Sequence, residues 1–211
     1  MVLASSNPGK LAEMRAILAG TGLEIRPQSE YDIAPAEETG LSFVENAIIK
    51  ARHASRITGL PALADDSGLC VDALNGEPGV HSARYADQGV DQGAGQDVNR
   101  NASDAANTTK LLAAMEKVAG PLRSARFQCV IAVLRHAADP VPIICQGTWE
   151  GSIQTGPAGS NGFGYDPVFH VPDHACSAAE LDSDTKNRIS HRGQALAALK
   201  QQLSLLGVRG T

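Results

Sequence analysis

The feature that most restricts the fold is a pair of apolar segments in the second half of the chain. The segment Phe127–Leu134 reads FQCVIAVL, and this run is typical of a buried strand. A second strand is expected over Ile143–Ile153. The short segment Ala137–Pro140 between them is turn-like, so the two strands are predicted to pair antiparallel.

The first half of the chain alternates between strand and helix patterns. Strands are expected over 2–4 and 23–26, and helices over 11–18 and 43–57. The second helix begins with Ser42 and Glu45, which have the spacing of a capping box. This alternation, followed by a hairpin, predicts an α/β protein with a mixed sheet.

Four further segments complete the expected organisation. Short strands over 62–64 and 69–71 flank Asp65–Gly68, and helical spacing resumes over 110–118. The segment Asp87–Asn107 is rich in Gly, Gln, Asn and Asp and is predicted to be a mobile surface loop. Ser190 is the expected cap of a last helix that runs to about Leu206.

Composition excludes some classes of protein. A chain of 211 residues suits one domain or two closely joined lobes. Its net charge of −5 argues against a general nucleic-acid binder or a protein of anionic membrane surfaces. The start lacks the charged flank and long apolar run of a signal peptide, and the four cysteines form no CxxC. We therefore expect a cytoplasmic protein with reduced thiols.

The loop Ser5–Lys10 lies between a predicted strand and a predicted helix. Such a loop can direct backbone N–H groups and the positive helix end at an anion, and Lys10 adds a full charge. It is not a P-loop, since Ala4 stands where the first glycine should be. A plain turn with an N-cap and a solvated lysine is an equally good interpretation of this segment alone.

Two acidic pairs and one lysine are candidates for a metal site. Asp65 and Asp66 could hold Mg²⁺ or take a proton from water, although a simple turn is the better interpretation of Asp65–Gly68 taken alone. The neighbouring acids Glu37 and Glu38 are a second pair, with a solvated loop as the alternative. Lys50 shares a helix side with small residues, where a surface lysine is the more common explanation.

Two later segments could recognise a base. In Gly159–Pro167 the glycines allow close backbone approach, Phe163 offers a stacking surface, and Asp166 could accept from a base N–H. Lys186 and the segment Ser190–Gly193 stand at or before a helix start, where an Arg and a neutral His could read base oxygens. An elaborate turn and a capped helix with solvated charges are the alternatives.

Taken together, these motifs resemble the inosine/xanthosine triphosphate pyrophosphatase (Ham1-like) family, which removes deaminated purine nucleotides. The matching segments are, in chain order, Ser5–Lys10 with Glu13, Glu38–Gly40, Glu45–Ala47, Lys50–Ala51, Ala64–Leu69, Pro78–Gly79, Ser82–Tyr85, Gly162–Pro167, Lys186 and Ser190–Gly193. Ser5 stands where threonine is common, which keeps the hydroxyl. The segment 87–107 is longer than usual, so no role is carried over to it.

The resemblance implies a single pyrophosphatase domain over 1–211, with a long mixed sheet flanked by helices, two lobes with an active-site cleft between them, and a homodimer. It implies Mg²⁺-dependent hydrolysis of ITP, dITP, XTP and dXTP to the monophosphate and pyrophosphate. Phosphates would be bound by Ser5, Ser6, Asn7, Pro8, Gly9, Lys10 and Lys50. Glu38 and Asp66 would hold the metal, and Asp66 would be the base for the attacking water, with Ser67 beside it. The purine would be held by Phe163, Gly164, Tyr165, Asp166, Lys186, His191 and Arg192.

Two other functions remain open at this point. A non-catalytic nucleotide sensor would bind through the same residues without turnover, although Asp65 and Asp66 speak against it. A pyrophosphatase that acts on other damaged bases or on ordinary dNTPs is the nearer alternative.

Overall fold

The strands of the chain form a seven-stranded sheet in the order β2-β1-β3-β4-β5-β6-β7. The structure, a computed structural model, describes residues 1–87 and 103–205. Its strands are β1 Val2–Leu3, β2 Arg26–Pro27, β3 Ala62–Val71, β4 Ser124–Leu134, β5 Ile143–Ile153, β6 Phe169–Val171 and β7 Cys176–Ser177. Its α-helices are α1 Pro8–Leu18, α2 Phe43–Thr58, α3 Asp104–Ala114, α4 Ser183–Ile189 and α5 His191–Leu205.

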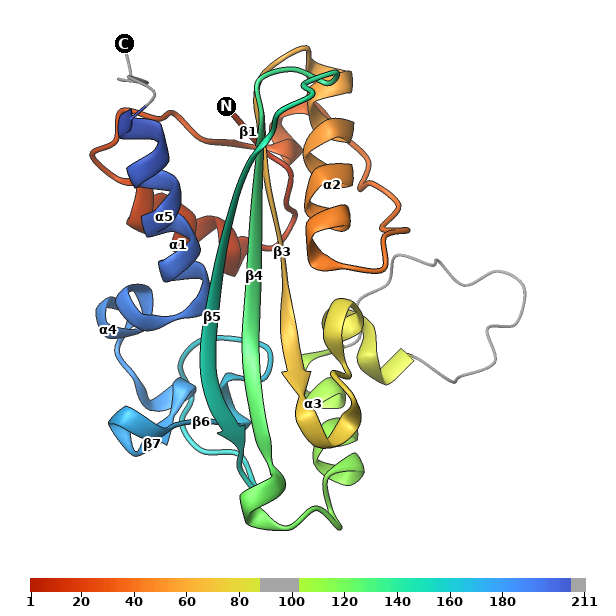
Figure 1. The fold of residues 1–211 in the computed structure, drawn as a ribbon, viewed down its shortest axis with the longest axis vertical. Coiled ribbons are helices and arrows are strands. Elements are labelled where there is room, and N and C mark those ends of the chain that lie inside the picture. Colours follow the sequence, from red (N-terminus) through yellow and green to blue (C-terminus); the bar gives the residue numbers. More distant parts are fainter. Residues whose placement is uncertain (88–102, 206–211) are drawn as a thin grey trace. The chain divides into compact units, whose positions relative to one another are not determined.

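The sheet is mixed, as the sequence predicts. Strand β1 pairs parallel with both β2 and β3, whereas β5, β6 and β7 pair antiparallel. Strands β4 and β5 run in opposite directions on either side of the loop 135–142, which confirms the expected hairpin (Figure 1). The α/β class is therefore confirmed.

The chain divides into two compact units. The first unit contains residues 1–67, 129–148 and 187–211, and the second contains 68–128 and 149–186. Three of the boundaries fall inside β3, β4 and β5, and the fourth falls inside α4. The cleft between two lobes stays a prediction from the family resemblance.

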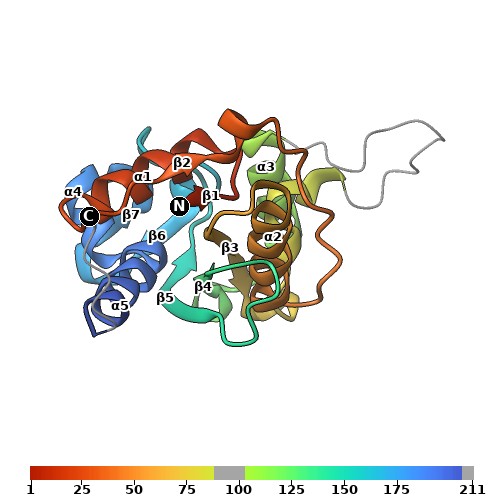
Figure 2. The same cartoon turned by 90° about the horizontal axis from the view of Figure 1, so that it is seen from above.

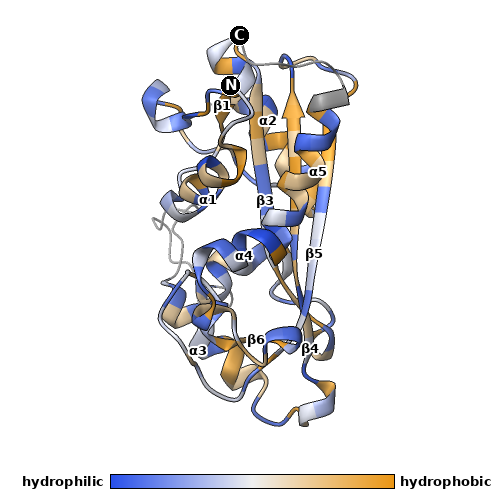
Figure 3. Ribbon diagram, turned by 90° about the vertical axis from the view of Figure 1, so that its left-hand side faces the viewer, coloured by the Kyte–Doolittle hydropathy of each residue, from blue (hydrophilic) through white to orange (hydrophobic). Residues whose placement is uncertain are grey.

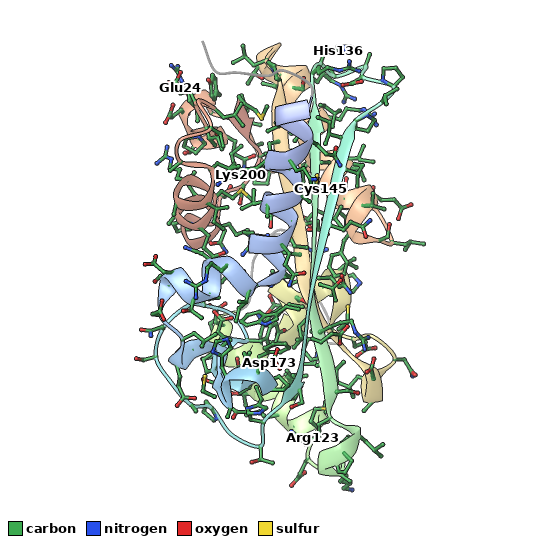
Figure 4. All side chains as sticks on the ribbon, turned by 60° about the vertical axis from the view of Figure 1, so that its left-hand side comes forward. Glu24, Arg123, His136, Cys145, Asp173 and Lys200 are labelled. Carbon is green, nitrogen blue, oxygen red and sulfur yellow. The ribbon has the colours of Figure 1, made fainter. Side chains whose placement is uncertain are left out.

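The core of the first unit has two layers, one on each face of its strands. Apolar residues of β1, β3 and β4 alternate along each strand: Leu3, Leu63 and Ile131 pack with α1 and α5, whereas the residues next to them pack with α2. Figure 2 shows α2 on the opposite side of the strands from α1 and α5. The strands between these helices carry mostly hydrophobic residues (Figure 3). Cys145 of β5 belongs to the layer that packs against α5 (Figure 4).

The second unit is held by an aromatic cluster and a buried arginine. The ring of Phe169 lies 4.6 Å from that of Phe127 and 5.3 Å from that of Trp149, measured between centroids. Arg123, labelled in Figure 4, donates to the carbonyl oxygens of Met115, Val118, Ile153 and Gln154. These bonds fix the segment after α3 to the end of β5.

Local capping signals set the helix starts. Ser42 accepts from the Glu45 N–H and its hydroxyl donates to the Glu45 carboxylate, so helix α2 begins where the capping box predicts. The Ser190 hydroxyl accepts from the Gly193 N–H at the start of α5, as expected.

Four local predictions differ from the structure. The predicted strand over 23–26 is reduced to β2, which has two residues. The predicted turn Asp65–Gly68 is the middle of a continuous strand, β3. The helix expected over 110–118 is α3, which begins and ends earlier. The prediction of a mobile loop over 87–107 is wrong at its C-terminal end, because Asp104–Asn107 is the first turn of α3 and Ser103 is its cap. Residues 88–102 of that prediction lie outside the described residues.

Candidate functional site

The adjacent acids Asp65 and Asp66 lie at the centre of a cluster of charges in the first unit. Because successive side chains of a strand point to opposite faces, β3 directs Asp65 toward α1 and α5 and directs Asp66 toward α2. Both carboxylates are almost completely buried, with exposed fractions of 1% and 6%. Burial of this kind is tolerated only where cations or other donors compensate the charge.

Asp65 has two cationic partners. Its Oδ2 lies 2.9 Å from Lys10 Nζ and 3.1 Å from Arg192 Nη2, and it accepts from the Ser67 hydroxyl at 3.1 Å. Burial alone would raise the pKa of Asp65, but Lys10 and Arg192, with help from Lys50, hold it well below its usual value. The geometry and this lowered pKa favour the ionised form of Asp65, as a counterion to Lys10 and Arg192.

Asp66 is paired with a lysine of α2. Lys50 Nζ donates to Asp66 Oδ1 at 2.7 Å and lies 3.1 Å from Glu38 Oε1. Burial lowers the pKa of Lys50, but the neighbouring charges of Asp66 and Glu38 outweigh burial and raise it overall. For Asp66 burial dominates and raises the pKa above its ordinary value, against the opposing effect of Lys50. The second oxygen, Asp66 Oδ2, is buried and has no hydrogen-bond partner among the described residues.

The loop 5–10 starts helix α1, and Asn7 is its cap. Asn7 Oδ1 accepts from the N–H groups of Gly9 and Lys10 at 2.9 and 3.2 Å. The N–H groups of these two residues therefore serve the N-cap, which is the alternative interpretation of this loop, and Pro8 has no N–H. The side-chain donors that a ligand could use are the hydroxyls of the two serines, the Asn7 amide and the Lys10 ammonium.

The first turn of α5 supplies Arg192 to the same cluster. The guanidinium is 2% exposed; Nη1 donates to Glu13 of α1, and Nη2 donates to the Ser67 hydroxyl at 2.9 Å as well as to Asp65. His191, the preceding residue, is also buried. The helix start lies close to β5, because a Cβ at Gly147 would lie 2.7 Å from Ala195 N and closer still to the His191 carbonyl oxygen.

A second group of predicted site residues belongs to the second unit. Lys186 Nζ lies 2.6 Å from Asp166 Oδ2 and 4.9 Å from the centroid of the Phe163 ring. Asp166 Oδ2 also accepts from the Phe163 N–H, and Asp166 is 2% exposed. The Tyr165 hydroxyl donates to the Ser82 carbonyl oxygen, and the Gly164 N–H donates to Asp104. Asp166 and Tyr165 thus hold the loop together, while Phe163 and Lys186 lie side by side.

Three residues to which the sequence assigned no role stabilise this arrangement in the first unit. Glu13 is a partner of Arg192. Asn46, which is fully buried, accepts from the Gly40 N–H at 2.8 Å and donates to the Gly40 carbonyl, so it anchors the segment that carries Glu38. Gln28 donates to the Ser6 hydroxyl. Glu13 and Asn46 lie within matched motifs, whereas Gln28 is signalled only by its place directly after β2.

A metal ion bound by the cluster would need carboxylate oxygens that its lysines and arginine do not already occupy. The described residues contain no group of three or more His, Cys, Asp or Glu side chains arranged to hold a metal ion.

Within 1–87 and 103–205, none of the helices has the length and hydropathy that a membrane span requires.

The fold and the cluster define the class: an α/β protein whose mixed sheet carries paired carboxylates. The helices beside it supply two lysines and an arginine, a set of charges suited to an anionic ligand. The chain belongs to the Ham1 family, whose family model matches residues 1–202. The family expected from the sequence motifs is therefore confirmed.

Individual relatives match along almost the whole chain. A protein of Vibrio cholerae named dITP/XTP pyrophosphatase is 54% identical over 199 residues, which cover 94% of each chain. A Xanthomonas campestris protein of the same name is 55% identical over 208 residues, covering 99% of this chain and 98% of the relative. The solved structure of a HAM1 protein from Coxiella burnetii is 53% identical, has a TM-score of 0.85, and is matched over 97% of this chain and 98% of its own.

Proposed function

We propose that this protein hydrolyses deaminated purine nucleoside triphosphates, namely ITP, dITP, XTP and dXTP, to the monophosphate and pyrophosphate. The observation that carries this proposal is the cluster in which Lys10, Lys50 and Arg192 surround the adjacent carboxylates of β3. The names of the full-length relatives support the same reaction. The chain is accordingly an enzyme, a nucleoside triphosphate pyrophosphatase that acts on the α-β phosphoanhydride.

The charge balance of the cluster supports a metal cofactor. Among the ion pairs seen in residues 1–87 and 103–205, Lys10, Lys50 and Arg192 are paired with the carboxylates of Glu13, Glu38, Asp65 and Asp66. A cluster with more carboxylates than cations repels a highly anionic triphosphate unless a further cation enters with it.

The residues present fit Mg²⁺. Oxygen ligands suit this ion, and the buried Asp66 Oδ2 has no other partner among the described residues. Glu38, held near Asp66 through Lys50, would supply a second carboxylate. When bound, Mg²⁺ neutralises phosphate oxygens and polarises the anhydride.

The side chains of the cluster have separate roles in the reaction. Asp66 orients the attacking water and takes its proton, since a carboxylate held next to the reacting phosphate can act as a general base. Lys10 and Lys50 leave their carboxylate partners to neutralise oxygens of the triphosphate and of the departing pyrophosphate. Asp65 stays charged and keeps Arg192 in place.

We assign recognition of the purine to hydrogen-bond donors of the protein that face the oxygen at C6 of the base. Hypoxanthine and xanthine carry that oxygen, whereas adenine carries an amino group, and fixed donors are left unpaired by the wrong base. Arg192, His191 and the backbone at the start of α5 are the candidate donors. Phe163 offers a stacking face beside Lys186, and Asp166 holds both of them in place.

The remaining proposals concern the whole protein. We assign residues 1–211 to one pyrophosphatase domain of two lobes, supported by the family match over 1–202. We also propose that the protein is a cytoplasmic homodimer. Its ligand is the nucleotide substrate, and it binds neither nucleic acid nor membrane.

A panel of triphosphates tests the proposed function. Pyrophosphate release is measured for ITP, XTP, dITP, ATP, GTP and dATP, with Mg²⁺ and with EDTA. We expect turnover of the deaminated purines only, and only with Mg²⁺. Binding without turnover would favour the nucleotide sensor, and equal rates on ATP and ITP would favour a general pyrophosphatase.

A further inference from the structure

The candidate phosphate loop and a buried glutamine lie at the same edge of the sheet. Strands β1 and β2 are parallel, with Leu3 opposite Pro27, so the residues that follow them leave the sheet side by side. Ser6 follows β1, and Gln28 follows β2 directly. Gln28 is 6% exposed, whereas Ser6 is exposed to solvent.

The hydrogen bond between these residues has a definite direction. Gln28 Nε2 donates to Ser6 Oγ at 2.7 Å. A serine hydroxyl has one proton and two lone pairs, so an oxygen that accepts from an amide keeps its proton for another partner. No acceptor among the described residues takes that proton.

The neighbouring side chains of the loop have the same polarity. Ser5 Oγ accepts from the Asn7 N–H at 3.3 Å, and Asn7 Oδ1 accepts from Gly9 N and Lys10 N. The protein therefore occupies the acceptor atoms of three consecutive side chains, and their donor groups remain for a ligand. Side chains that turn their donor groups outward favour an anion over a neutral ligand.

We propose that Gln28 is a positioning residue that holds the Ser6 hydroxyl as a hydrogen-bond donor to a substrate phosphate; this inference rests on the proposed function. Ser6 can rotate its hydroxyl toward any nearby acceptor. The Gln28 amide offers it a donor instead, so the Ser6 proton stays directed at the anion. Replacing this amide by a carboxylate reverses the bond, because Ser6 would then donate to the protein.

The test is a double-mutant cycle between Gln28 and Ser6. The variants Gln28→Glu, Ser6→Ala and their combination are assayed for kcat and KM on ITP with Mg²⁺, and for inhibition by inorganic pyrophosphate. We expect each single variant to lower kcat/KM about tenfold, and the double variant to be no worse than Ser6→Ala. In Gln28→Glu the defect should also shrink as the pH falls toward about 4, the ordinary pKa range of a glutamate, because a protonated carboxyl can donate as the amide does.

Matched variants separate this role from other effects. Gln154→Glu makes the same chemical change at an amide that donates to the Pro167 carbonyl, and we expect it to leave kcat/KM unchanged. If Gln28→Glu does not fold, Gln28→Met removes the donor without adding charge and enters the same cycle. A Gln28 effect that persists in the Ser6→Ala background, or no Gln28 effect at all, would overturn the inference. Loss of ITP turnover in the unmodified protein would instead overturn the proposed function.

Discussion

At the scale of single residues, the two adjacent aspartates differ because strand geometry gives them different surroundings. Asp65 meets Lys10 and Arg192 and has a lowered pKa, whereas Asp66 meets mainly Lys50 and has a raised pKa. Environments that separate the pKa values of neighbouring acids also separate their chemical roles. The sequence predicts two carboxylates here, and the strand places them on opposite faces, where they meet different cations.

Replacement of Asp66 by asparagine tests the role of the base. We expect Asp66→Asn to lower kcat for ITP by roughly 10²–10⁴-fold, because the amide cannot take a proton. The fold should persist, since the amide can still accept from Lys50. Turnover and the far-ultraviolet circular dichroism spectrum are measured together; a wild-type rate would remove Asp66 from this role.

Replacement of Arg192 by alanine separates base recognition from phosphate binding. We expect Arg192→Ala to weaken ITP binding far more than binding of inorganic tripolyphosphate. The variant should also lose about 3–5 kcal/mol of stability, because it removes one of the two cations that pair with the buried Asp65. Inhibition constants and denaturant unfolding provide the two measurements. Equal weakening for both ligands would show that Arg192 holds phosphate only.

At the scale of elements, prediction succeeds where the signal is local. Helix α2 was predicted over 43–57 and is found over 43–58, because a capping box and a left-handed Gly59 mark its ends. The turn expected at Asp65–Gly68 fails, although its residue types favour turns. There the distant cations Lys10, Lys50 and Arg192 compensate the carboxylates, so the chain can stay extended through them.

Gly147 of β5 lets helix α5 start close to that strand, because glycine has no Cβ. We expect Gly147→Ala to destabilise the protein by about 1–3 kcal/mol, because the new Cβ would overlap the backbone of His191 and Ala195. The same change should reduce activity, since it displaces the turn that carries Arg192. Gly156→Ala is the control, because a Cβ there meets nothing within 4 Å. Equal stability of the two variants, by urea unfolding, would contradict the argument.

The turn between β4 and β5 should make stability depend on pH. Asp139 accepts from the N–H groups of Arg135 and Val141 and from the Arg135 side chain, and hydrogen bonding to Arg135 lowers the pKa of its carboxyl below the usual 3.8. Because the pKa of Asp139 is lowered in the folded state, its ionised carboxylate stabilises the fold at pH values above the usual pKa of 3.8. This stabilisation is lost as the pH falls below that value. The difference in free energy of unfolding between wild type and Asp139→Asn should therefore shrink below about pH 4.

The control for this experiment is a carboxylate outside the turn. Asp173, labelled in Figure 4, is exposed in the second unit. We expect Asp173→Asn to leave the free energy of unfolding within about 0.5 kcal/mol of wild type at pH 7. A difference between wild type and Asp139→Asn that stays constant from pH 7 to pH 3 would argue against the pKa effect.

At the scale of the whole molecule, the sequence shows no linker between the two units because the boundaries between them fall inside strands and a helix. The chain crosses between its two units within β3, β4, β5 and α4. Composition does not change at these points, since a strand that continues through a boundary keeps the residues of a strand. A search for glycine- or proline-rich connections therefore cannot find the division.

The excess of carboxylates in the cluster predicts that ligand and metal bind together. We expect Mg²⁺ alone and inorganic pyrophosphate alone to change the melting temperature of the protein little. Both together, at about 100 times their dissociation constant, should stabilise it by about 2.7 kcal/mol. Thermal unfolding under the four conditions gives the coupling between the two ligands. Full stabilisation by pyrophosphate without metal would contradict the charge argument.

The sequence by itself determined the family, the α/β class, the hairpin and the residues of the candidate site, because motifs, caps and apolar periodicity are local properties of the chain. The tertiary structure decided the pairings: which lysine meets which aspartate, and that Gln28 supports Ser6. These pairings join residues from different elements. They depend on strand register and on which face each side chain takes, and both are fixed only when the elements pack.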